Sequence, residues 1–427
     1  MAANPKETRT ALFIVTSFWA VGELLIALEL AERLKSYGIS PLFLAPPSHE
    51  KILKEKKLAY VLLIPKAGNI NRIQMKEIQD RHKPGWIVLA DHLNYTFCER
   101  HYGLTLDDLD VFSGRLGTLD LYDYRKAIGK ADTYGFVAKN LNQVPIDRYQ
   151  FFLQPAPVLA PGQGDQPDAI RYPLFQDVIP RTETHKEKSR NTMGIKKDEK
   201  LIIYTTSLWQ QRYKPYKNSH HFIQACLKTM EHLFLELLKD ENVKIFSIGV
   251  RSLFKDGEPA NFKHFDQMNP AEFNALRDGA DLFLSNNYIS TSMAKMVLAG
   301  IPTLLLSNSF LKMKQQTGGN GQTWLQKWPA RPNLPHPEIL TDVETAYPFR
   351  MFPVGWYKFL NHVVKDNPYY SLMHREELFD TPRVLDTINR ILNQHPETGA
   401  QERADYIESL SRMTDLDNDF AVPHPGK

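Results

Sequence analysis

Short apolar runs separated by amphipathic segments restrict the fold of this chain more than any other feature of its sequence. None of the runs alternates apolar with polar residues, so each predicts a strand buried on both faces, as strands of parallel sheets are. The runs lie at 11–15, 40–45, 60–64 and 86–90 in the first half, and at 201–206, 243–249, 281–285 and 303–307 in the second.

The segments between these runs have the spacing of amphipathic helices. Leu24, Leu28 and Leu34 fall on one helical face, and the helix is expected to stop near Gly38. Residues 222–238 show the same pattern in the second half. The predicted fold class is therefore α/β, with two doubly wound, Rossmann-like domains. In such folds ligands bind beyond the carboxyl ends of the strands, so two domains that face each other form a cleft.

Chain length indicates two domains, and the distribution of proline indicates where they divide. A chain of 427 residues is long enough for two cores. Residues 155–180 hold six prolines and predict an irregular connection. We therefore expect an N-terminal acceptor-binding domain at 1–175 and a C-terminal donor-binding domain at 176–382.

The charge and cysteine content exclude several classes. A net charge of +3 is too small to predict nucleic-acid binding, but it leaves open a local patch for an anionic membrane surface. The only cysteines, Cys98 and Cys226, lie in different predicted domains, which excludes a disulfide framework. No window is apolar enough for a membrane span, and MAANPKETR lacks a signal-peptide core, so we expect a cytoplasmic protein.

Small polar side chains follow the apolar run 281–285, where a strand is expected to lead into a helix. Free backbone N–H groups and the helix dipole at such a position favour an anion, and hydroxyl groups add further donors. The alternative is that one of these residues only caps the helix, which is a common role for Ser and Thr. The residues concerned are Asn286, Asn287, Ser290, Thr291 and Ser292.

The segment 265–302, FDQMNPAEFNALRDGADLFLSNNYISTSMAKMVLAGIP, resembles the donor-binding region of GT-B glycosyltransferases, especially the MurG-type and UDP-glycosyltransferase families. The resemblance implies that the backbone of Met268 pairs with the nucleotide base and that Ser292 contacts the diphosphate. Asn287 occupies the position of a phosphate-binding His. In the loop after the first strand of this domain, Thr206, Ser207 and Arg212 are further candidates for diphosphate contacts.

Two departures from the family pattern concern the sugar and ribose. Lys295 stands where the family has a Glu that accepts hydrogen bonds from the ribose hydroxyls, and an ammonium group can only donate. Lys295 either faces a phosphate or ribose oxygen, or is a surface Lys on a helix. The sugar-binding Asp-Gln pair is also missing, because Ser307 leads into NSFLKMKQQ.

Residues 13–34 resemble the first strand, glycine loop and first helix of the same families, with Gly22-Glu23 where many members have Gly-His. Glu23 is a candidate general base, because an ionised carboxylate at a helix start can take a proton from an acceptor hydroxyl. The alternative is a Glu that only stabilises the helix end. Ser17 and Gly22 are assigned to the acceptor site.

Asp91 and His92 follow the run 86–90. The resemblance implies a role for Asp91, because members with a catalytic His orient it with an Asp after this strand. Here Asp91 is a second candidate base and His92 a candidate acceptor ligand, unless Asp91 only caps the loop.

The predicted function is metal-independent, inverting transfer of a sugar from a nucleotide diphosphate sugar to a small-molecule or lipid-linked acceptor. No cofactor beyond this donor substrate is expected. Two alternatives stay open: a nucleotide-sugar epimerase of the same fold, and a catalytically silent homologue that binds a ligand or partner. Because GT-B chains cross back to their first domain near the end, residues 383–427 are expected to form a helix on that domain and a tail.

Overall fold

The computed structural model describes residues 9–18, 21–126, 130–132, 138–140, 146–162, 166–175, 180–206, 219–249, 251–254, 257–266, 268, 270–287, 289–307, 362–393, 399–413 and 415–420. The chain divides into two compact units. Unit 1 comprises 1–127, 143–177 and 407–427, and unit 2 comprises 128–142 and 178–406.

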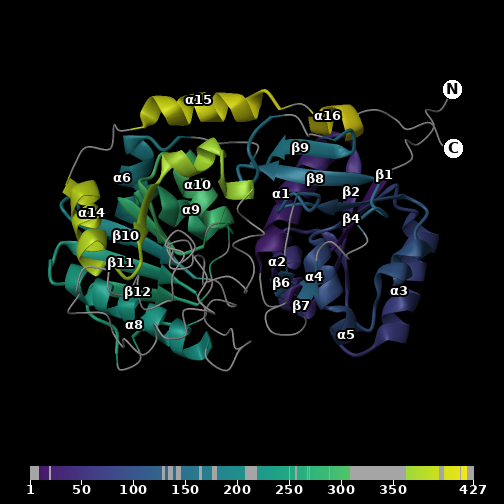
Figure 1. Ribbon diagram of the computed structural model, residues 1–427, viewed down its shortest axis with the longest axis horizontal. Helices are drawn as coiled ribbons and strands as arrows, with labels where there is room; N and C mark the ends of the chain where they lie inside the picture. Colours follow the sequence, from purple (N-terminus) through teal and green to yellow (C-terminus); the bar gives the residue numbers. More distant parts are fainter. Residues whose placement is uncertain are drawn as a thin grey trace, which may run out of the picture. The chain divides into compact units, whose positions relative to one another are not determined.

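Unit 1 is built on a seven-stranded parallel sheet in the order β3-β2-β1-β4-β5-β8-β9 (Figure 1). Its strands are β1 (Arg9–Ile14), β2 (Ile39–Ala45), β3 (Ala59–Leu62), β4 (Trp86–Leu89), β5 (Arg115–Leu119), β8 (Phe151–Ala156) and β9 (Ala169–Pro173). Its helices are α1 (Gly22–Ser36), α2 (Glu50–Glu55), α3 (Gly68–His82), α4 (His92–Phe97) and α5 (Glu99–Tyr102), with 3-10 turns at Pro47–His49 and Leu106–Val111.

The core of unit 1 forms because the central strands are apolar on both faces. Leu12, Ile87 and Leu89 point to the face that α3, α4 and α5 cover, where they pack against side chains such as Met75 and Tyr95. Burial on both faces is the reason why the apolar runs of the sequence do not alternate.

Unit 2 repeats this architecture with six parallel strands in the order β12-β11-β10-β13-β14-β15. The strands are β10 (Lys200–Thr205), β11 (Val243–Ile248), β12 (Phe262–Phe265), β13 (Leu282–Ser285), β14 (Thr303–Ser307) and β15 (His374–Glu377). The helices are α6 (Glu183–Met193), α8 (Ser219–Leu237), α9 (Pro270–Gly279), α10 (Thr291–Leu298) and α14 (Thr381–Asn393), with a 3-10 turn at Pro368–Leu372. A separate antiparallel pair consists of β6 (Lys130–Asp132) and β7 (Ala138–Asn140).

The strand orders confirm the predicted fold class, because both sheets are doubly wound. In each sheet the first three strands in the chain run outward in one direction and the later strands in the other, as in Rossmann domains. All eight apolar runs form strands of these sheets, and the helix expected over 24–34 is α1. In the described part of the chain, no helix has both the length and the apolar character that a membrane span requires.

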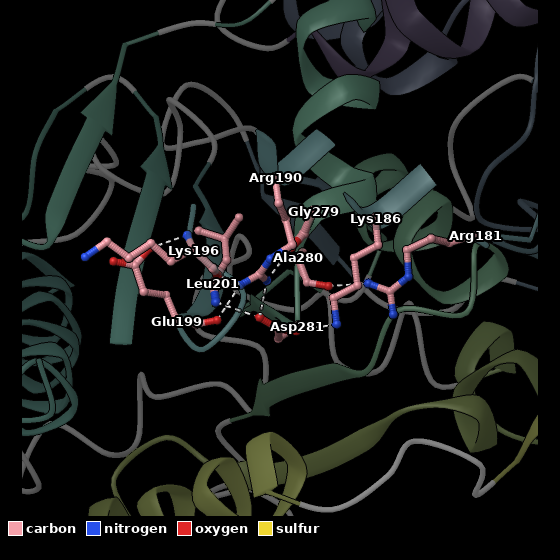
Figure 2. A network of polar contacts seen from close by, with 9 residues as sticks. All are labelled: Arg181, Lys186, Arg190, Lys196, Glu199, Leu201, Gly279, Ala280 and Asp281. Carbon is pink, nitrogen blue, oxygen red and sulfur yellow. Dashed lines mark hydrogen bonds and ion pairs between the residues drawn. The ribbon is translucent and has the colours of Figure 1, made fainter. Parts of the chain in front are cut away.

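A network of buried polar contacts joins α6 to the segments that precede β10 and β13 in unit 2 (Figure 2). Arg190, only 6% exposed, donates from Nη1 to Asp281 Oδ2 at 2.8 Å and from Nη2 to the Lys196 carbonyl at 2.6 Å. Its guanidinium also bonds the carbonyls of Gly279 and Glu199. Asp281 pairs with Lys186 as well, at 2.7 Å. Burial raises the pKa of Asp281, but Lys186, the Leu201 N–H and Arg190 outweigh it and hold the pKa below its ordinary value.

The sequence predicts that residues 383–427 form a helix on the first domain, followed by a tail. The helix at the start of this range is α14, and its residues Val384, Ile388 and Leu392 belong instead to the core of unit 2. The return to unit 1 occurs later, within α15 (Ala400–Ser411), and is completed by α16 (Asp415–Phe420), which packs on β9. Phe420 contacts the ring of Trp86.

The proline-rich stretch 155–180 is likewise not an irregular connection throughout, because it contains the end of β8 and all of β9. Pro155 pairs only with Tyr172 of β9, since the pairing of β8 with β5 ends at Leu153. A proline, which lacks an N–H, is tolerated where a strand has lost one neighbour.

Candidate functional site

Most of the predicted site residues that the structure describes follow the strands at the switch point of each sheet, where the strand order reverses and α/β folds bind ligands. In unit 1 this point lies between β1 and β4, which pair in register up to Ile14 and Leu89. Ser17 and Glu23 follow β1, and Asp91 and His92 follow β4. The structure therefore brings the predicted acceptor-site residues together.

Glu23 lies in the first turn of α1 and is 9% exposed. Its two carboxylate oxygens each accept a hydrogen bond: Oε2 from the Ser17 hydroxyl at 3.0 Å and Oε1 from the Asn94 amide at 2.8 Å. Burial raises the pKa of Glu23, while its own backbone N–H, Ser17 and Asn94 act in the opposite direction. A carboxylate held in this way is oriented and has an increased affinity for a proton.

Asp91 caps α4 and is 4% exposed. Its Oδ1 accepts hydrogen bonds from the Asn94 N–H at 2.9 Å and from the Tyr124 hydroxyl at 3.2 Å. Burial, followed by the charge of Glu23, raises the pKa of Asp91 to about 8. Asp91 therefore caps a helix, where the sequence suggested a loop cap, and it also interacts electrostatically with the other candidate carboxyl group, Glu23.

His92 and Gly22 occupy the first positions of α4 and α1. His92 is fully buried, and its Nδ1 lies 2.5 Å from the Tyr149 hydroxyl. The rings of Tyr124 and Tyr149 meet the imidazole edge-on. An added Cβ at Gly22 would lie in open space.

Three polar residues of this site were missed in the sequence: Asn94, Asp120 and Tyr124. Asp120 follows β5 and is fully buried, accepting hydrogen bonds from the Tyr124 N–H and from Gln154 Nε2 at 3.0 Å. Burial raises its pKa to about 6. The strand RLGTL before Asp120 has a Gly in its centre, so the apolar pattern that revealed Asp91 is absent.

His49 is a further buried polar residue beyond a strand end, in the turn after β2. Burial lowers the pKa of its imidazole to about 4, although the backbone of Ser17 acts in the opposite direction. His49 is therefore neutral at neutral pH and adds no positive charge next to Ser17.

In unit 2 the switch point lies between β10 and β13, whose last residues Thr205 and Ser285 are in register. Thr206 follows β10, and its N–H bonds the Ile248 carbonyl at 2.9 Å. Asn286 follows β13 and donates to the hydroxyl of Tyr204 at 3.0 Å, which fixes its side chain in the buried strand end.

In the loop before α10 and in its first turn, one residue caps the helix and others present partly exposed hydroxyl groups. Ser290 is the N-cap, because its hydroxyl accepts a hydrogen bond from the Met293 N–H at 3.2 Å. Asn287 is partly exposed, and its Oδ1 accepts a hydrogen bond from the Ile289 N–H within the same loop. Thr291 and Ser292 are the first two helical residues, and both are partly exposed. The cap is thus assigned to one residue, which leaves two hydroxyls in the first turn for other contacts.

The remaining donor candidates lie around this turn or outside the described residues. Lys295 is partly exposed and lies one helical turn after Thr291 in α10. Met268 is partly exposed between β12 and α9. Ser207 and Arg212 fall outside the part of the chain that the structure describes. Within that part, no three His, Cys, Asp or Glu side chains are grouped as a metal site would need.

Comparisons with known proteins give one family and several similar folds. A family model described as "Family of unknown function (DUF6365)" matches residues 30–421. No curated protein matches the chain. Similar solved structures include the spinosyn forosaminyltransferase SpnP, with 12% identity, a TM-score of 0.49, and 97% of this chain and 100% of that chain covered.

Two further solved structures are similar at lower TM-scores. HepE of Anabaena, in complex with UDP and glucose, has 10% identity and a TM-score of 0.45, covering 89% of this chain and 99% of that chain. MurG of Acinetobacter baumannii has 13% identity and a TM-score of 0.37, covering 90% of this chain and 99% of that chain. Identities this low do not transfer a function from one protein to another.

Proposed function

The chain belongs to DUF6365, a family of unknown function, and we propose that it transfers a sugar from a nucleotide diphosphate sugar to an acceptor hydroxyl. The observation that carries this proposal is Glu23, a nearly buried carboxylate at the switch point of unit 1. It is oriented by Ser17 and Asn94, and among the described residues no Lys or Arg pairs with it. A carboxylate without a cationic partner keeps the basicity that a general base needs.

The proposed step uses Glu23 as the base. The acceptor O–H bond breaks and its proton passes to the Glu23 carboxylate, while the acceptor oxygen forms a bond to the anomeric carbon. The bond from that carbon to the diphosphate oxygen breaks, and the nucleoside diphosphate leaves with the electron pair. Attack from the side opposite the leaving group inverts the anomeric carbon. Ser17, Gly22 and His92 are proposed to line the acceptor site.

Unit 2 is proposed to bind the donor at its own switch point. The first turn of α10 offers N–H groups and the hydroxyls of Thr291 and Ser292 to the diphosphate. These donors stabilise the charge that develops on the leaving group, so the proposed reaction is metal-independent. Lys295 is proposed to add positive charge near a phosphate, and Met268 to meet the base.

Further donor contacts are proposed from Thr206, Asn286 and Asn287, and from Ser207 and Arg212, which lie outside the described residues. A cytoplasmic location and a small-molecule or lipid-linked acceptor, the latter met at a membrane surface, belong to the same proposal. No cofactor beyond the donor is required.

Two other functions would use the same architecture. A nucleotide-sugar epimerase would need no acceptor and would return the donor with altered stereochemistry. A silent homologue would bind a ligand without turnover. Two departures from the GT-B glycosyltransferase pattern favour it: Lys295 in place of a Glu, and the absence of the Asp-Gln pair after Ser307. The carboxylate arrangement around Glu23 favours an enzyme over the silent homologue, because a binding protein has no need of a buried base without a cationic partner.

Ser292→Ala and Ser290→Ala are expected to separate donor binding from helix capping. Ser292→Ala should weaken binding of the cognate nucleoside diphosphate by about 1 to 2 kcal/mol, or about tenfold in Kd, with unchanged stability. Ser290→Ala removes the cap and should lower the free energy of unfolding by about 1 kcal/mol. Calorimetric titration and urea denaturation of both variants measure the two quantities. Unchanged affinity in Ser292→Ala would remove the α10 start from the proposed donor site.

A further inference from the structure

We infer that Glu23 and Asp91 share one proton in the resting protein, with Glu23 ionised and Asp91 neutral, and that Tyr124 is the positioning residue that orients the Asp91 carboxyl group. The catalytic consequence of this arrangement rests on the proposed function, but the arrangement of the proton does not. It assigns the base to Glu23 and turns Asp91 from a second candidate base into a hydrogen-bond donor.

The first support is the position of the carboxyl groups. Glu23, Asp91 and Asp120 follow β1, β4 and β5, which are consecutive neighbours in the sheet. All three are buried, and among the described residues none of them forms an ion pair with Lys or Arg, although Arg125 interacts with Asp120 at longer range. Glu23 and Asp91 cannot both be ionised without a cation to pair with, because each charge loses its hydration and repels the other.

The hydrogen bonds decide which member of the pair carries the charge. Glu23 accepts a side-chain hydrogen bond on each of its two oxygens, from Ser17 and Asn94, which favours the ionised form. The two close hydrogen bonds to Asp91, from the Asn94 N–H and the Tyr124 hydroxyl, reach the same oxygen, Oδ1, and the Leu93 N–H adds a further contribution that favours the ionised form. This leaves Asp91 as the group that keeps its proton, in agreement with its pKa of about 8, which burial and then the charge of Glu23 bring about.

Tyr124 joins this pair to the third carboxyl. Its hydroxyl donates to Asp91 Oδ1, while its backbone N–H donates to Asp120 at 3.1 Å. Asp120 is held in turn by Gln154 Nε2 at 3.0 Å, and Gln154 Oε1 accepts from Arg171 at 3.1 Å. Tyr124, in the loop after β5, thus fixes the orientation of Asp91.

Other titratable groups also surround Asp91. Burial raises the pKa of the Cys98 thiol to about 12 and raises the pKa values of Tyr124 and Tyr149, so these three groups are neutral at neutral pH. None of them therefore supplies a charge to Asp91. The groups that face Asp91 from the elements around it are Glu23 of α1, Cys98 before α5, Tyr124 after β5 and Tyr149 before β8, with His92 next to it in α4. Asp120 accepts a hydrogen bond from the Tyr124 N–H and is not among the main causes of the pKa shift of Asp91.

The order of ionisation predicts an asymmetric response to two substitutions. Glu23→Gln removes a negative charge that opposes ionisation of Asp91, so the pKa of Asp91 should fall. Asp91→Asn replaces a group that is already neutral when Glu23 titrates, so the pKa of Glu23 should stay nearly unchanged. Carbon-13 NMR titration of the labelled carboxyl groups in the full chain measures both. The reverse asymmetry, a fall for Glu23 alone, would overturn the assignment.

Tyr124→Phe tests the positioning role, with Tyr95→Phe as its matched control. The loss of a hydroxyl that donates to ionised Asp91 should raise the proton affinity of Asp91 about tenfold. Tyr95 is equally buried, but its hydroxyl donates to the Thr105 carbonyl, so its removal should leave Asp91 unchanged. Equal titration of Asp91 in both variants would refute the role of Tyr124. These titrations need no donor or acceptor, so absence of sugar transfer would contradict the proposed function and leave their result valid.

Discussion

Replacing Glu23 with Gln is expected to lower kcat for sugar transfer by about 10²- to 10⁴-fold, with donor affinity nearly unchanged. Gln keeps the size of Glu23, and its amide can still meet Asn94 and the Ser17 hydroxyl, which can rotate to accept a hydrogen bond. The basic oxygen is lost, so the acceptor proton has no recipient. Steady-state kinetics with the cognate donor and acceptor measure the effect.

Two control variants separate this role from a structural one. Glu32→Gln changes an exposed carboxylate of the same helix that pairs with Lys35, and turnover should stay normal. Asp91→Asn should reduce turnover less than Glu23→Gln, because it replaces a neutral hydrogen-bond donor. Near-normal turnover of Glu23→Gln with a small stability loss would establish Glu23 as a helix-end residue only. If Asp91→Asn alone abolished turnover, the base would lie after β4.

Arg190→Ala is expected to lower the free energy of unfolding of unit 2 by about 3 to 5 kcal/mol. The substitution leaves the Lys196, Glu199 and Gly279 carbonyls without this donor and removes one of the two cations on Asp281 (Figure 2). The buried groups would keep their desolvation cost without the compensating bonds. Urea denaturation followed by circular dichroism measures the loss.

Arg383→Ala is the matched control in the same unit. Its guanidinium pairs with Glu376, but the side chain is 69% exposed, so the expected loss is only about 0 to 1 kcal/mol. A comparable loss in both variants would mean that burial of Arg190 contributes no additional stability.

The architecture could be predicted because a strand that is buried on both faces appears in the sequence as an uninterrupted apolar run. Runs such as ALFIV and WIVLA contain no polar residue that would suggest a surface helix, and each forms a central strand. Other strands lack such a run: β5 contains Gly117, β8 contains Pro155, and β15 is His-Arg-Glu-Glu. Their places are set by pairing with neighbours far away in the chain, which local patterns do not record.

The candidate site could be predicted in part for the same reason. Glu23 and Asp91 follow strands that the apolar pattern reveals, so their meeting at one sheet edge could be expected. Asn94 gave no such signal, because its contact with Glu23 joins residues 71 positions apart through the sheet. The helix α14 was misplaced because an apolar helical face does not say which sheet it packs against, and its place in unit 2 comes from packing against α8, β13 and β15.

Release of nucleoside diphosphate from a panel of UDP-, dTDP-, GDP- and ADP-sugars tests the proposed function most directly. The account predicts that the wild-type chain releases the diphosphate from at least one donor when acceptors are supplied, and that Glu23→Gln does so far more slowly. The product should have the opposite anomeric configuration to the donor. Recovery of every donor unchanged, or as an epimer without diphosphate release, would contradict the assignment of this chain as a sugar transferase.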